Sequence, residues 1–166
     1  MPFYGMVAQQ KGWTRFVEVG VYTGTSYVYL LKRLKARGTP FEFYAVDLWD
    51  SEYTEFGLPV NEEHYQHFLK RLRSEGVEAD AKIIRETSIN AAFQFPRASL
   101  DFVFIDANHD YKWVSTDIAV WLPTIRPGGM IAGHDYGEDC GVKQAVDEHF
   151  EEVSVMGTCW YRSIKA

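Results

Sequence analysis

The sequence has only two cysteines, Cys140 and Cys159, among its 166 residues. Two well-separated cysteines are too few for a zinc motif or a disulfide framework, so we expect both to be reduced packing residues. The chain also lacks any apolar run of about 18 residues, the length that a membrane-spanning helix requires. Residues 1–14 include Gln9 and Lys11 and contain no unbroken apolar stretch, which argues against a signal peptide. These absences predict a cytoplasmic protein with no membrane partner.

Positive charge is scarce as well. The chain has 17 Lys and Arg residues against 23 Asp and Glu residues, which gives a formal net charge of −6. This acidic balance argues against nucleic acid or an anionic membrane as the main partner. The apolar content of 46% and the aromatic content of 16% are those of a globular chain. The length is close to the roughly 150 residues of a typical domain, so we expect a single domain over residues 1–166.

Short apolar runs alternate with segments of helical periodicity along most of the chain. Strands are expected at residues 15–20, 41–46, 81–85, 100–105, 130–132, 153–155 and 160–164. Helical faces are expected within residues 27–34, 65–72, 89–93, 114–122 and 142–150. Such alternation favours parallel pairing of the strands. The predicted fold is therefore α/β: a single Rossmann-like, doubly wound, mostly parallel seven-stranded sheet with helices on both faces.

Acidic residues and histidines follow nearly every expected strand. Ligands of doubly wound sheets bind outside the carboxyl ends of the strands, so these side chains should meet at one edge. A chance distribution of surface charge rarely produces this pattern, and we interpret the edge as functional. The residues concerned are Glu18, Asp47, Glu86, Asp106, His109, His134 and Asp135.

A glycine-containing turn, Glu18-x-Gly20-x-x-x-Gly24, follows the first expected strand. Its glycines do not have the G-x-G-x-x-G spacing of the dinucleotide fingerprint, and no lysine follows as in a P-loop. Glu18 would also repel a phosphate group. The turn therefore suits a cationic or hydroxyl-bearing ligand better than a pyrophosphate; a plain strand-to-helix turn is the alternative.

Residues 18–26 resemble motif I of the class I S-adenosylmethionine (SAM)-dependent methyltransferases, and the catechol O-methyltransferase-like branch in particular. Residues 102–109 and 122–136 are similar to segments of a small bacterial and viral subgroup of that superfamily. The resemblance extends over about residues 15–150, which is most of the chain.

The resemblance implies a SAM site at the predicted edge, with the glycine turn around the methionine part of the cofactor. Ser26 would bind the cofactor carboxylate at a helix N-terminus, where free N–H groups favour an anion. Asp47 would accept two hydrogen bonds from the ribose diol, and Ser88 would lie beside the adenine. Trp49 would form an apolar wall there, unless it only fills the edge of the core. The implied cofactor site comprises Glu18, Gly20, Tyr22, Gly24, Ser26, Asp47, Ser88 and Asp106.

The resemblance also implies a divalent metal site made of Asp106, His134 and Asp135, with Mg²⁺ or Mn²⁺ as the ion. Adjacent strand residues point in opposite directions, so His134 and Asp135 converge only if the backbone bends between them. A strand-capping role for His134 is the alternative. His109 stands where metal-dependent relatives have a lysine base, and it would either take the proton or bind metal or substrate. The predicted catalytic residues are His109 and Asp106.

The predicted activity is SAM-dependent methyl transfer, on the oxygen of a small hydroxylated molecule and assisted by a metal. N-methylation is disfavoured because residues 105–108 contain no [DN]-P-P-[YFW] motif. A non-catalytic module that binds SAM or a nucleoside is the main alternative, and a metal-dependent hydrolase or sugar-modifying enzyme is a weaker one. The chain is short, and only residues 48–60 could cover a substrate, so a second copy in a homodimer could complete the site.

Other polar residues are expected to lie outside the site. Asp110 should cap a helix, and Asp117 should be a surface charge. The histidines of the expected helices should be solvated or lie at the edge of the core; they are His64, His67 and His149.

Overall fold

The computed structural model describes residues 2–50, 59–137 and 141–165. These residues form a seven-stranded sheet in the order β3-β2-β1-β4-β5-β7-β6. The first five strands pair in parallel, and β7 is antiparallel to both β5 and β6. The strands are β1 (Arg15–Val19), β2 (Glu42–Asp47), β3 (Ala81–Arg85), β4 (Leu100–Ile105), β5 (Ile125–Gly133), β6 (Ser154–Met156) and β7 (Cys159–Ser163). The predicted sheet is confirmed.

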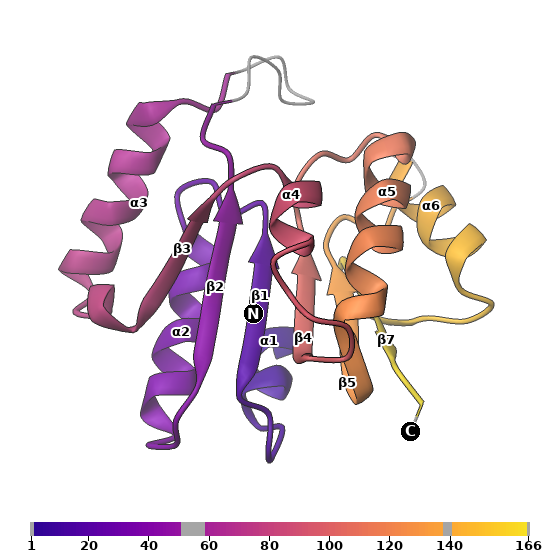
Figure 1. Ribbon diagram of the computed structural model, residues 1–166, viewed down its shortest axis with the longest axis horizontal. Helices are drawn as coiled ribbons and strands as arrows, with labels where there is room; N and C mark the ends of the chain where they lie inside the picture. The colour runs from indigo at the N-terminus through magenta and orange to yellow at the C-terminus, as the bar shows by residue number, and fades with distance from the viewer. Residues whose placement is uncertain (1, 51–58, 138–140, 166) are drawn as a thin grey trace.

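Helices cover both faces of the sheet, as predicted. In Figure 1, α4 and α5 lie in front of the sheet and α1 and α2 behind it. Two buried apolar clusters match this division: one joins the sheet to α1–α3 and the other joins it to α4–α6. The helices are α1 (Pro2–Ala8), α2 (Thr25–Ala36), α3 (Glu62–Ser74), α4 (Ser88–Ala92), α5 (Tyr111–Trp121) and α6 (Gly141–His149), with 3-10 turns η1 (Glu78–Asp80) and η2 (Leu122–Thr124).

The strands of the sheet centre alternate between the two clusters. Phe102 and Phe104 of β4 belong to the first cluster, whereas Val103 and Ile105 belong to the second. All six residues of β4 are buried, because helices cover the strand on both sides. This explains why five of its six residues are apolar; the exception, Asp101, is buried with its Oδ2 accepting hydrogen bonds from the N–H groups of Thr14 and Arg15.

Helix α1 was not expected from the sequence. It has seven residues, which is too short for a helical period to stand out. Its buried side chains pack on the sheet, and the ring centroids of Tyr4 and Phe104 lie 5.0 Å apart. Tertiary packing, rather than intrinsic propensity, stabilises this helix.

Strand β5 is longer than the predicted residues 130–132. It begins at Ile125 and runs through Pro127. Pairing with β4 shifts register between Leu100 and Phe102, and this irregularity accommodates the Pro-Gly-Gly segment at the exposed start of the strand. Within the described part of the chain, no helix combines the length and hydrophobicity needed to cross a bilayer.

Candidate functional site

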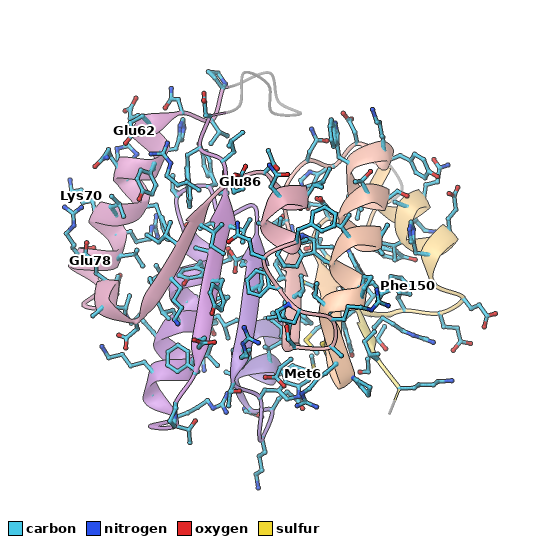
Figure 2. The ribbon with its side chains drawn as sticks, viewed as in Figure 1. Met6, Glu62, Lys70, Glu78, Glu86 and Phe150 are labelled. Atoms are coloured by element: carbon cyan, nitrogen blue, oxygen red, sulfur yellow. The ribbon has the colours of Figure 1, made fainter. Side chains whose placement is uncertain are left out.

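The carboxyl ends of the parallel strands meet at one edge of the sheet, and the strand order reverses there between β1 and β4. Such a reversal is where doubly wound sheets bind ligands. In Figure 2, Glu62 at the start of α3 and Glu86 after β3 lie toward this edge, whereas Met6 lies toward the opposite one. The residues after β1, β2, β4 and β5 therefore define the candidate site.

The loop from Gly20 to Gly24, here called the β1–α2 loop, is held in a left-handed backbone conformation at three positions. The φ angles are 84° at Gly20, 53° at Tyr22 and 78° at Gly24. A Cβ at Gly20 would collide with the backbone carbonyl of Asp106. Glycine is thus required at position 20, and the loop lies directly against the chain that leaves β4.

Asp47 holds the β1–α2 loop through its backbone. Its Oδ2 accepts hydrogen bonds from the N–H groups of Val21 (2.9 Å) and Tyr22 (2.8 Å), and its Oδ1 accepts one from Trp49 (3.0 Å). A carboxylate has about four acceptor positions, so the bonds from the described residues leave one position, on Oδ1, for a ligand. The predicted pair of bonds to a ribose diol is therefore reduced to one bond from this residue.

Glu18 lies beneath the loop rather than at its exposed edge. Its side chain is fully buried, with Oε1 2.6 Å from the Ser26 hydroxyl and Oε2 3.4 Å from the Tyr4 hydroxyl. Burial raises the pKa of the Glu18 carboxyl to about 8, and the nearby charge of Asp106 also raises it, whereas the bonds from Ser26 and Tyr4 oppose the shift. Full burial thus keeps Glu18 from direct contact with a ligand, contrary to the prediction that it binds the cofactor, and its Oε1 is engaged by Ser26.

Glu18 should make the protein less stable as the pH rises. Between pH 4.5, the usual pKa, and pH 8 the folded carboxyl keeps its proton while the unfolded one loses it. The free energy of unfolding should fall across this window by about 4 kcal/mol. Glu18→Gln should remove this decrease, so the free energy of unfolding of the variant should rise relative to that of the wild type as the pH rises.

Urea denaturation at pH 5 and pH 8.5 measures this difference. Glu151→Gln, which changes an exposed carboxylate, serves as the control and should follow the wild type. Parallel behaviour of the wild type and Glu18→Gln would show that Glu18 is ionised in the folded protein.

Trp49 does not form a wall of the site. Its side chain is 1% exposed, its ring stacks on Phe68 of α3, and its Nε1–H donates to the carbonyl of Tyr22 at 2.7 Å. The alternative reading, that Trp49 fills the edge of the core, is correct. Tyr22 itself is half-exposed and lies against the ring of His64.

Ser88 begins α4 and is tied to two buried side chains of α5. Its hydroxyl lies 2.5 Å from Asp117 Oδ1 and accepts a hydrogen bond from Trp121 Nε1 at 2.9 Å. The prediction that Asp117 is a surface charge is wrong, because this residue is 4% exposed and burial raises its pKa to about 6. The sequence carried a signal for this: Asp117 lies between Val114 and Trp121 on the apolar face of the helix.

The residues after β4 and β5 converge. Asp106, His134 and Asp135 each offer one possible ligand atom, and these three atoms all lie within 4.8 Å of one another. His134 Nδ1 lies 2.9 Å from Asp135 Oδ1 and 4.0 Å from Asp106 Oδ1. Asp135 has a φ of 52°, and this is the bend that adjacent residues need in order to converge. We call these three residues the acidic-histidine cluster.

This cluster fits a divalent cation by its donor set. Two carboxylates and one imidazole suit Mn²⁺ and related ions, and the carboxylates alone suit Mg²⁺. The other imidazole nitrogen of His134, Nε2, lies 2.7 Å from the Thr158 hydroxyl, so Nδ1 is the nitrogen that faces the carboxylates.

His109 lies beside the cluster. Its Nε2 is 3.3 Å from Asp135 Oδ2 and 3.7 Å from Asp106 Oδ1, and its side chain is 14% exposed. The structure thus brings together the four residues that the sequence placed at this edge, and whether His109 accepts a proton or binds a metal stays open from the sequence.

The remaining expectations concern residues outside the cluster. Asp110 occupies the N-cap position of α5, and Cys159 is a buried free cysteine. His64, in the capping box of α3, is partly exposed, His67 is exposed, and His149 contacts a carbonyl at the end of α6. Cys140 and most of the predicted covering segment, residues 51–58, lie outside the described residues.

Comparison with protein families gives a match over residues 17–136, more than half of the chain, to a family described as a methyltransferase domain. The match includes the β1–α2 loop, Asp47 and the acidic-histidine cluster. Among curated proteins, the uncharacterized protein y4gI of Sinorhizobium fredii is 27% identical over 121 residues. That stretch is 73% of this chain but only 13% of the relative.

Solved structures share the fold. The O-methyltransferase TomG of Streptomyces achromogenes, determined with SAM, has a TM-score of 0.71 at 16% identity, over 99% of this chain and 78% of that one. An O-methyltransferase of Bacillus cereus, determined with S-adenosylhomocysteine (SAH), has a TM-score of 0.65 at 17% identity, over 96% and 78%. A precorrin 8w decarboxylase of Methanobacterium thermoautotrophicum has a TM-score of 0.66 at 15% identity, over 94% and 75%. The architecture thus supports more than one reaction.

Proposed function

Since the chain belongs to the methyltransferase domain family, as its sequence motifs predicted, we propose that it transfers a methyl group from SAM to the oxygen of a small hydroxylated acceptor. One observation carries the proposal. Gly20 packs on the backbone of Asp106, so the loop suited to a sulfonium nucleoside and the cluster suited to an acceptor hydroxyl adjoin each other. Proximity of this kind is the main contribution an enzyme makes to an in-line displacement.

The β1–α2 loop and its supports are the proposed cofactor site. Gly24 caps α2 without a side-chain bond, which leaves the first N–H groups of the helix suited to a carboxylate. When Glu18 is protonated, its O–H can donate to Ser26 Oγ, and the Ser26 hydroxyl can then donate to that carboxylate. The remaining acceptor position of Asp47 takes one ribose hydroxyl.

Further proposed cofactor contacts follow the sequence prediction. Tyr22 borders the methionine part, and Asp106 faces it from the end of β4. Ser88 is proposed to lie beside the adenine, where its bonds to α5 fix its position.

The acidic-histidine cluster is the proposed metal site, formed by Asp106, His134 and Asp135. A divalent ion bound there would lower the pKa of an acceptor hydroxyl and orient its oxygen. Mg²⁺ and Mn²⁺ are the proposed ions.

His109 is the proposed general base. Its Nε2 is buried against the carboxylates of the cluster, and the proposal requires that an acceptor bound to the cluster approaches this atom. As the oxygen–carbon bond forms and the carbon–sulfur bond breaks, the hydroxyl proton passes to this nitrogen. General-base catalysis of this type contributes about 10²- to 10⁴-fold.

Calorimetric titration tests the cofactor assignment. SAM and SAH should bind, and NAD should not, because the β1–α2 loop lacks a pyrophosphate site. Asp47→Ala removes two hydrogen bonds to the backbone of the loop and one to the backbone of Trp49, and it should weaken SAM binding at least about tenfold. His109→Ala should leave SAM affinity unchanged and lower the rate at which labelled methyl groups reach a panel of phenols, catechols and sugars.

Binding of NAD alone would refute the proposal. Binding of SAM with no transfer to any hydroxylated acceptor would favour the alternative, a module that holds the cofactor without catalysis. The single-domain organisation over residues 1–166, the cytoplasmic location and homodimer formation stay predictions of the sequence.

A further inference from the structure

Thr158 lies in the turn of the β6–β7 hairpin, and it contacts His134 of the acidic-histidine cluster from a later part of the chain. Gly157, with a φ of 66°, makes the turn, and β7 pairs antiparallel with β5 up to Gly133 and Trp160. This pairing places Thr158 beside the end of β5. No pattern in the sequence predicts this contact.

Two hydrogen bonds join Thr158 to the residues on either side of Asp135. The Thr158 hydroxyl lies 2.7 Å from His134 Nε2, and its carbonyl accepts from the N–H of Tyr136 at 3.0 Å. Asp135 lies between them in the left-handed conformation, which is unfavourable for a residue with a Cβ and must be held by its surroundings. Thr158 thus braces the bend on which convergence of His134 and Asp135 depends.

The hydroxyl of Thr158 can also influence which ring nitrogen of His134 carries the proton. With no ion bound, an Nδ1–H can donate to Asp135 Oδ1, 2.9 Å away, while Nε2 accepts from the threonine hydroxyl. A metal ligand must instead offer a lone pair at Nδ1, so the ring proton must sit on Nε2 and donate to Thr158. A hydroxyl can do both, because it is a donor and an acceptor.

We infer that Thr158 is a positioning residue for a metal ion: it holds the His134 ring with Nδ1 toward the carboxylates and receives the Nε2 proton in the metal-bound form. The inference rests on the proposed metal site and adds to it a residue that is not a ligand. It predicts that metal affinity depends on the Thr158 hydroxyl even though this group does not contact the ion.

Titration with Mn²⁺ alone, followed by calorimetry, tests this dependence. Thr158→Val keeps the shape and removes the hydroxyl, and it should lower Mn²⁺ affinity about tenfold. Thr158→Ser should restore affinity to within about twofold of the wild type, because it restores the hydrogen bond. Thr116→Val, which removes a hydroxyl bonded to a carbonyl within α5, is the matched control and should bind Mn²⁺ like the wild type.

A second measurement uses the wild-type protein and does not depend on the folding of a variant. Nitrogen-15 NMR of the protein saturated with Zn²⁺, a diamagnetic ion that takes imidazole nitrogen as a ligand, should show His134 with its proton on Nε2. An unprotonated Nε2 in that state would overturn the inference, as would Thr158→Val binding Mn²⁺ as tightly as the wild type. Failure of the wild type to bind either ion would overturn the proposed metal site itself, and the inference with it.

Discussion

Replacing Asp106 with asparagine should lower Mn²⁺ affinity by more than about 100-fold, beyond the 10- to 100-fold that loss of an outer partner costs. Asp106 faces both histidines, with its Oδ1 4.0 Å from His134 Nδ1 and 3.7 Å from His109 Nε2, and it would supply one of the two carboxylate ligands. Asparagine keeps the shape of the side chain and removes its charge. Direct titration with Mn²⁺ measures the loss without knowledge of the acceptor.

The matched control is Asp110→Asn. It removes the same negative charge from the same segment between β4 and α5, at an exposed residue that is not a member of the cluster. It should bind Mn²⁺ like the wild type. If both variants bound the ion equally well, the acidic-histidine cluster would not be a metal site, whereas SAM binding by the β1–α2 loop would be unaffected by that result.

Gly20→Ala should destabilise the protein by at least about 3 kcal/mol, which places it among the most damaging single substitutions. Two effects add at this position. The φ of 84° is unfavourable for alanine, and the new Cβ would collide with the carbonyl of Asp106. Urea denaturation measures the change in the free energy of unfolding.

Gly12→Ala separates the two effects. Gly12 has a similar φ of 78°, but a Cβ there would meet no atom within 4 Å. It should cost only about 1–2 kcal/mol, the penalty for the left-handed backbone alone. Equal losses in the two variants would mean that the β1–α2 loop does not pack on the chain after β4, contrary to the structure.

Much of the fold follows from local patterns in the sequence. A strand buried on both faces has mostly apolar residues, as in β4, whereas a helix buried on one face has apolar residues at the helical period, as in α2. These two patterns predict both elements. Parallel pairing then brings the ends of β1, β2, β4 and β5 to one edge. The meeting of Asp106, His134 and Asp135 could therefore be predicted from where the strands end.

The side-chain partners could not be predicted in the same way. Glu18 is buried because Tyr4, from a helix too short to recognise, closes over it. Ser88 is engaged by Asp117, which is 29 residues away in sequence. Contacts of this kind depend on how helices pack across the sheet, and the period of one segment does not encode them. The bend at Asp135 was stated only as a condition, because nothing in the sequence shows that a non-glycine residue adopts a positive φ.

The strand order has a consequence for synthesis on the ribosome. The β1–α2 loop and Asp47 precede the acidic-histidine cluster in the chain, and the pairing of β1 with β4 brings these two parts of the candidate site together. A nascent chain that ends before β4 has neither the neighbour that Gly20 rests on nor the central strand of the sheet. The two parts of the candidate site therefore come together only after β4 and β5 have been synthesised.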